Sequence, residues 1–194
     1  LARSPWRAAK RFGTELFYRI NPEPVFILGN QKSGTTAIAS LLAHATGLSA
    51  TLDLLSDIQN SEYIDVYKGK MPLEKYLHRH KIEFSRDLIK EPNLTLLYPM
   101  LKSGFPRARF VFVIRDPRDN IRSILNRLNL PGDAARLSQQ QLRNIPPAWL
   151  PVLDSGWLGC QSGHYIEMLA YRWSRMAKTY LNERENFILV KYED

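Results

Sequence analysis

The chain has 194 residues, 44% of them hydrophobic, and carries a formal net charge of +8. This length suits one domain with a substantial core, and no apolar run approaches the length of a transmembrane helix. A single cysteine, Cys160, excludes an internal disulfide framework and favours a reducing compartment. Four histidines without ligand spacing argue against a metal site. The excess positive charge suits nucleic acid, anionic lipid or an anionic small ligand as partner.

Residues 1–23 make a basic N-terminal segment. Ser4 and Pro5 are typical of a helix start, and this helix would carry basic side chains on one face and mainly apolar ones on the other. The basic residues are Arg7, Lys10 and Arg11, and the opposite face carries Trp6, Ala9, Gly13 and Leu16. A helix over residues 4–19 could contact a membrane surface peripherally, but packing against the domain is the favoured interpretation.

The most informative motif follows an apolar run at residues 25–28, which predicts a buried strand. The chain then turns between Gly29 and Gly34 and continues as a helix from Thr35. We expect the apolar face of this helix to consist of Ile38, Leu41, Leu42 and Ala45. Backbone N–H groups at such a helix start bind a phosphate or a similar oxyanion. A Gly-bounded turn without a ligand is the alternative.

The loop is close to a nucleotidase P-loop but differs in the place of its lysine. That motif has lysine directly after the second glycine, where this chain has Thr35. The lysine here is Lys32, two residues before Gly34, so it would reach a bound anion from the loop and not from the first helical turn.

A second anion site is predicted around residues 110–125. Residues 110–114 read as another buried strand, which Arg115 follows directly. Asp116 and Pro117 then start a helix, as N-cap and first helical residue. Its buried stripe is Ile121, Ile124, Leu125 and Leu128, which leaves Ser123 outside. Arg115 and Ser123 could hold one phosphate beside the sheet edge, although an ion pair between Arg115 and Asp119 is the alternative.

Predicted strands near 25–28, 87–90, 110–114 and 187–190 alternate with helical stretches. This order predicts an α/β domain over residues 24–194, with three layers and helices on both faces of a central parallel sheet. Its ligand should lie at the carboxyl ends of the strands. Residues 129–163 are rich in Pro and Gly and lack a sustained period, so we expect an acceptor-binding lid or a mobile insertion.

The sequence Gln-Lys-Ser-Gly-Thr-Thr after the first strand resembles the 5′-phosphosulfate loop of sulfotransferases that use 3′-phosphoadenosine 5′-phosphosulfate (PAPS). The resemblance spans roughly residues 24–194 and implies a P-loop-like nucleotide-binding core. It assigns the 3′-phosphate to Arg115 and Ser123, the adenine edge to Tyr192, and the sulfuryl group to Lys90. The loop residues that it implies for the 5′ side are Gln31, Lys32, Ser33, Gly34, Thr35 and Thr36.

The resemblance implies sulfuryl transfer from PAPS to a hydroxyl or amine of a small-molecule, carbohydrate, lipid or peptide acceptor, with no metal and no nucleic acid. Lys32 would stabilise the leaving phosphate and Lys90 the sulfuryl oxygens. Cytosolic members carry a histidine where this chain has Pro92, and often a tryptophan where it has Ala37. The chain therefore looks nearer to the heparan, tyrosylprotein and bacterial types, which use a carboxylate base.

Asp53 is the expected general base, with Glu62 and Glu91 as rivals, and an N-cap before Leu54 is the other interpretation of Asp53. A cytoplasmic location is expected, with the Golgi lumen as the alternative. The chain lacks an initial methionine and ends where the family pattern continues, so we expect a piece of a longer protein with an incomplete C-terminal part.

Two other functions remain open at this point. A P-loop kinase would use Thr36 and Asp116 as magnesium contacts, although its lysine is misplaced. A non-catalytic basic module would bind nucleic acid or an anionic membrane with a steep salt dependence.

Overall fold

The computed structural model describes residues 18–134 and 136–194, and the helix predicted over 4–19 lies almost entirely outside these ranges. Five parallel strands form one sheet in the order β2-β3-β1-β4-β5. The strands are β1 (Val25–Gly29), β2 (Ala50–Thr51), β3 (Leu88–Lys90), β4 (Arg109–Ile114) and β5 (Phe187–Lys191). The short strand β2 was not predicted from the sequence, because two residues carry no periodicity.

The central strands are apolar throughout because helices cover both of their faces. Phe26 of β1 lies beside Ile89 of β3 and Phe110 of β4. Phe26 and Phe110 face a large aromatic core, whereas Ile27 and Val111 face a smaller aliphatic core on the other side. Alternate side chains of one strand thus build two cores, as the strand period requires.

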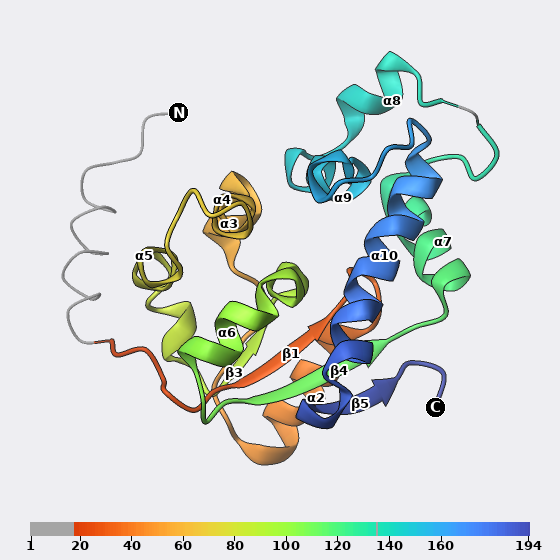
Figure 1. Ribbon diagram of the computed structural model, residues 1–194. Coiled ribbons are helices and arrows are strands. Elements are labelled where there is room, and N and C mark those ends of the chain that lie inside the picture. The colour runs from red at the N-terminus through yellow and green to blue at the C-terminus, as the bar shows by residue number, and fades with distance from the viewer. Residues whose placement is uncertain (1–17, 135) are drawn as a thin grey trace.

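Helices flank the sheet as predicted (Figure 1). Helix α2 packs on the aliphatic face, while α6 and α10 pack on the aromatic face. The α-helices are α2 (Thr35–Thr46), α3 (Leu55–Asn60), α4 (Glu62–Tyr67), α5 (Leu73–Arg79), α6 (Tyr98–Gly104), α7 (Pro117–Leu128), α8 (Gln139–Asn144), α9 (Leu150–Leu153) and α10 (Tyr165–Asn182). Short 3₁₀ helices are η1 (Glu83–Ser85), η2 (Pro92–Leu97), η3 (Pro147–Trp149), η4 (Gly156–Leu158) and η5 (Arg184–Asn186). No helix within the described ranges is long and apolar enough to cross a membrane.

The predicted apolar face of α2 was confirmed at Ile38 and Leu42, which pack against the aliphatic core, and was wrong at Leu41 and Ala45. Thr35 and Ala39 are the buried residues of this helix, and Leu41 is 62% exposed. The helix begins directly after Gly34, and the methyl group of Thr35 lies toward Gly29 at the end of β1. Because Thr35 faces the sheet, Ala39, four residues later, faces the sheet as well, whereas Leu41 and Ala45 face solvent.

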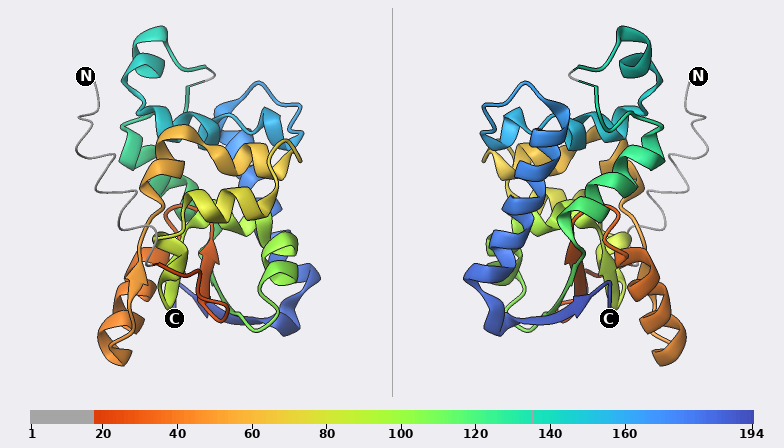
Figure 2. Two further views of the ribbon diagram at one scale, coloured as in Figure 1. Left: turned by 90° about the vertical axis from the view of Figure 1, so that its left-hand side faces the viewer. Right: turned by 90° about the vertical axis from the view of Figure 1, so that its right-hand side faces the viewer.

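Segment 129–163 is folded onto the ends of α7 and α10 and stands at the end of the molecule far from α2 (Figure 2). Its residues Ile145, Val152 and Leu153 pack with Ile124 of α7 and Leu169 of α10. Helix α8 begins with a full capping box between Ser138 and Gln141, and this helix was not predicted from the sequence. The role of this segment as an acceptor lid stays a prediction.

Candidate active site

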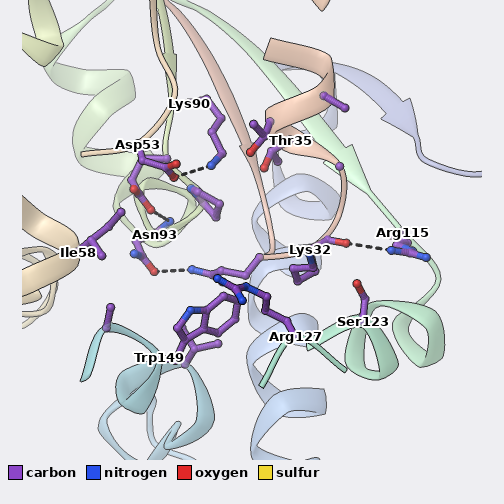
Figure 3. A pocket seen from close by; sticks show the side chains of 18 of the residues that line it. Lys32, Thr35, Asp53, Ile58, Lys90, Asn93, Arg115, Ser123, Arg127 and Trp149 are labelled. Carbon is purple, nitrogen blue, oxygen red and sulfur yellow. Dashed lines mark hydrogen bonds and ion pairs between the residues drawn. The ribbon is translucent and has the colours of Figure 1, made fainter. Parts of the chain in front are cut away.

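A pocket of about 520 Å³ opens at the carboxyl ends of β1, β3 and β4 (Figure 3). The loop after β1 lies between the ends of β3 and β4, because these two strands are the neighbours of β1 in the sheet. Helix α3, helix α7 and the η3–α9 segment complete the walls. This position is the ligand site that the strand order predicts.

Two glycines shape the loop between β1 and α2. Gly29 has φ 146°, and a Cβ there would lie 2.3 Å from the carbonyl oxygen of Val113. Gly34 has φ 91°, and its Cβ would lie 2.5 Å from the ring of Tyr192. Any side chain at either position would collide or strain the backbone, so both glycines are required for this close approach.

Buried polar side chains hydrogen-bond the loop and hold it in place. Asn120 of α7 is fully buried and donates to the carbonyl oxygen of Gln31 and to Oγ of Ser33, each at 2.9 Å. Thr95 Oγ1 accepts from the N–H of Gly29 at 2.9 Å and donates to its carbonyl oxygen. Lys32 has φ 67°, which residues other than glycine rarely adopt. These contacts fix an otherwise strained loop.

Five of the six predicted loop residues line the pocket, namely Gln31, Lys32, Gly34, Thr35 and Thr36. Ser33 is the exception, since its side chain is buried against Asn120 and its N–H donates to the carbonyl oxygen of Asn30 at 3.2 Å. Ser33 thus closes the loop on itself. A role of Ser33 in binding the 5′ side of a nucleotide stays a prediction.

Arg115, Ser123 and Tyr192 line the same pocket. Arg115 donates from Nη1 to the carbonyl oxygen of Lys32 at 3.2 Å, and its guanidinium lies 4.2 Å from the ring centre of Tyr192. Its Nε is buried and has no hydrogen-bond partner among the described residues. The alternative pairing with Asp119 is not found, because Asp119 pairs with Arg122 at 3.6 Å.

One cation at this end of the pocket was missed. Arg127 lies one helical turn after Ser123 on α7 and also lines the pocket. It has no ion pair within the described part of the chain. Its spacing of four residues from Ser123 was a readable signal, because residues at i and i+4 share one helix face.

Lys90 and Asp53 form an ion pair inside the pocket, with Nζ 2.6 Å from Oδ1 (Figure 3). The side chain of Lys90 is 6% exposed and that of Asp53 is 41% exposed. The sequence placed both residues in the site without predicting their contact. The N-cap interpretation of Asp53 is wrong, because α3 begins at Leu55 with Leu54 as its N-cap, and no side chain caps the helix there.

The two rivals of Asp53 are engaged elsewhere. Glu62 pairs with Arg79 at 2.6 Å and is not part of the pocket wall. Glu91 lines the pocket but is buried, and its two carboxylate oxygens accept N–H bonds from Asn93 at 3.0 Å and Leu54 at 3.4 Å. Burial raises the pKa of Glu91 to about 7. Asp53 is thus the better placed carboxylate for meeting a ligand.

Asp116, the magnesium contact of the kinase alternative, serves as a helix cap. Its carboxylate accepts the N–H of Arg118 at 2.9 Å and pairs with the guanidinium of the same residue at 3.1 Å. It is not part of the pocket wall. No group of three or more candidate metal ligands gathers within residues 18–134 and 136–194.

Two buried carboxylates, Asp57 and Glu91, predict how stability varies with pH. Burial raises the pKa of Asp57 to about 6 and that of Glu91 to about 7, from 3.8 and 4.5. The folded chain therefore binds more protons than the unfolded chain between these values, and stability falls as the pH rises through them. We expect the free energy of unfolding to drop by on the order of 1–3 kcal/mol between about pH 5 and about pH 7.5. Denaturant unfolding at several pH values measures this, and Glu91→Gln should flatten the curve. A wild-type curve that rises over this range contradicts the assignment.

Comparisons with known proteins agree with this geometry. Residues 22–194 match the family model of the sulfotransferase domain. A solved sulfotransferase from Alicyclobacillus acidocaldarius is 15% identical, with a TM-score of 0.49, over 88% of this chain and 73% of that one. Sulfotransferase STF1 from Mycobacterium tuberculosis H37Rv is 12% identical, with a TM-score of 0.51, over 97% of this chain and 67% of that one. No curated protein sequence matches significantly. The family model covers most of the chain, which therefore belongs to the sulfotransferase domain family.

Proposed function

We propose that the pocket binds PAPS and that the protein transfers its sulfuryl group to a hydroxyl or amine of an acceptor. The observation that carries this proposal is that two separate groups of residues suited to binding anions line one pocket. One is the glycine-bounded loop at the start of α2, and the other is formed by Arg115 and Ser123 beyond β4. A nucleotide with phosphates at both its 5′ and 3′ positions would engage both sites at once.

Three features of the pocket fit this nucleotide. The loop backbone at Gly34 lies directly against the ring of Tyr192, where a Cβ would collide with the ring, so an adenine edge at Tyr192 would adjoin the phosphate loop. Arg115 presents a buried Nε without a partner among the described residues, which suits an added anion. Arg127 lies beside Ser123 as a further cation for a phosphate. When bound, PAPS would supply an activated sulfuryl group.

The roles of the chain's own residues follow from their positions. Lys32 would neutralise charge that grows on the 5′-phosphate, and Lys90 would do the same for sulfuryl oxygens. Asp53, paired with Lys90, would take the proton of the acceptor hydroxyl. The acceptor would occupy the part of the pocket that Ile58 of α3 and Trp149 of η3 line (Figure 3).

The experiment that tests this proposal follows radiolabelled sulfur from PAPS into a panel of acceptors. The panel holds one alcohol or amine from each class: a phenol, a carbohydrate, a lipid and a tyrosine peptide. We expect transfer to one of these classes in the presence of EDTA, with inhibition by 3′,5′-ADP. Phosphoryl transfer from ATP that depends on magnesium would support the kinase instead.

A further inference from the structure

Arg172 is a charged residue in the middle of the protein core. It lies on α10 between Leu169 and Met176, in a stripe that otherwise packs apolar side chains, and it is fully buried. Helix α10 packs on η2, the segment that follows Lys90 and β3. Nothing in the helical pattern of the sequence distinguishes this arginine from a surface one.

The guanidinium of Arg172 joins two amide side chains that belong to different pocket walls. Its Nε donates to Oε1 of Gln31 at 3.2 Å, and its Nη2 donates to Oδ1 of Asn93 at 2.8 Å. Nε2 of Gln31 donates to the same oxygen of Asn93 at 2.7 Å. The three side chains therefore close a triangle between the loop after β1 and the end of β3.

Two corners of this triangle, Gln31 and Asn93, lie close in sequence to a lysine of the site. Gln31 directly precedes Lys32, and Asn93 follows Lys90 by three residues. The backbone N–H of Asn93 also donates to Glu91, so the segment after Lys90 is folded back against its own carboxylate. A shift of Arg172 would thus be transmitted to both lysine-bearing segments.

The burial of this charge has no clear benefit for stability. None of the ion pairs in the described ranges includes Arg172, and its Nη1 has no hydrogen-bond partner there. The guanidinium of Arg172 lies 6.0 Å from the ring centre of Trp157. Burial lowers the pKa of Arg172, and the nearby Tyr63 and Glu91 offset this effect only in part. The contacts with Gln31 and Asn93 require the planar set of donors of the guanidinium, which no apolar side chain supplies.

We propose that Arg172 is a positioning residue, which holds the segments of Lys32 and Lys90 at a fixed separation by bridging Gln31 and Asn93. The expected effect on catalysis rests on the proposed sulfuryl transfer, but the expected effect on the positions of the two segments does not. Two lysines that act on one transferring group must keep their spacing, since small displacements cost large factors in rate.

The test compares Arg172→Met, which removes the charge and the planar set of donors, with Arg172→Lys, which keeps the charge but loses the planar set of donors. Arg175→Met is the matched control, because Arg175 lies one turn later on α10 and donates to Tyr67 away from the pocket. We expect kcat to fall on the order of tenfold to a hundredfold in both Arg172 variants, with a smaller change in the KM for PAPS and none in the control.

Amide hydrogen exchange supplies a readout that does not depend on activity. Residues 29–36 and 91–95 should exchange faster in both Arg172 variants, while the centre of the sheet keeps its protection. If kcat and hydrogen exchange of Arg172→Lys equal those of the wild type, the proposal is overturned. If Arg172→Met does not fold, the result for Arg172→Lys alone decides the test. An equal loss of protection throughout the core would also overturn it, because that shows global destabilisation. If the wild-type protein transfers no sulfuryl group, the proposed function fails, and the exchange data still decide the role of Arg172.

Discussion

Replacing Lys32 by alanine is expected to lower kcat by on the order of 10²–10³-fold, while the affinity for 3′,5′-ADP falls by less than about tenfold. The helix start and the loop backbone still bind the phosphate without this lysine. The charge of Lys32 matters most where negative charge grows in the transition state. The strained backbone of Lys32 is held in place because Asn120 and Thr95 hydrogen-bond neighbouring loop residues.

The measurement is steady-state kinetics of sulfuryl transfer beside calorimetric binding of 3′,5′-ADP. Lys75→Ala is the matched control, because Lys75 is an exposed lysine of α5 outside the pocket. If Lys32→Ala raises only KM and leaves kcat intact, the lysine contributes uniform binding and the proposed role is wrong.

Asp53→Asn is expected to lower kcat by on the order of 10²-fold or more. Asparagine keeps the shape and an oxygen that can still accept from Lys90 Nζ, but it cannot take a proton from an acceptor hydroxyl. Because asparagine can still hold Lys90, a loss of kcat in this variant separates a base from a residue that only holds Lys90.

Two controls accompany this variant. Glu62→Gln breaks an ion pair with Arg79 outside the pocket and should leave kcat close to wild type. Glu91→Gln should have a milder effect than Asp53→Asn, since the oxygens of Glu91 already accept backbone N–H groups. A fully active Asp53→Asn together with an inactive Glu91→Gln would reassign the base to Glu91.

The parts of the fold that depend on contiguous sequence were predicted well. The strands at residues 25–29 and 109–114 are runs of apolar residues that end at a glycine or an arginine, and the helix after the second strand has its Asp116 cap and Pro117 start in place. Because such signals are local, they need no knowledge of the rest of the chain. The loop and the Arg115/Ser123 pair follow from these elements.

Contacts between distant segments could not be predicted in the same way. The ion pair of Lys90 and Asp53 joins the end of β3 to the chain before α3, and its partners are 37 residues apart in sequence. The burial of Arg172 has no local signal, because the helical pattern does not separate it from a surface arginine. The predicted face of α2 was wrong at Leu41 and Ala45 because Thr35, and not an apolar stripe, sets the face that meets the sheet. Tertiary packing decides all three cases.

The claim that this pocket is a site for a nucleotide with a 3′-phosphate is tested most directly by calorimetry. Wild-type protein and Arg115→Ala are each titrated with 3′,5′-ADP and with 5′-ADP in the presence of EDTA. An arginine–phosphate contact is charge-assisted and contributes roughly 1.5–3 kcal/mol. The wild type should therefore bind 3′,5′-ADP at least about tenfold more tightly than 5′-ADP, and Arg115→Ala should lose this preference while binding 5′-ADP almost unchanged. Equal affinities of the wild type for both nucleotides, or equal losses for both in Arg115→Ala, would contradict the assignment of the pocket.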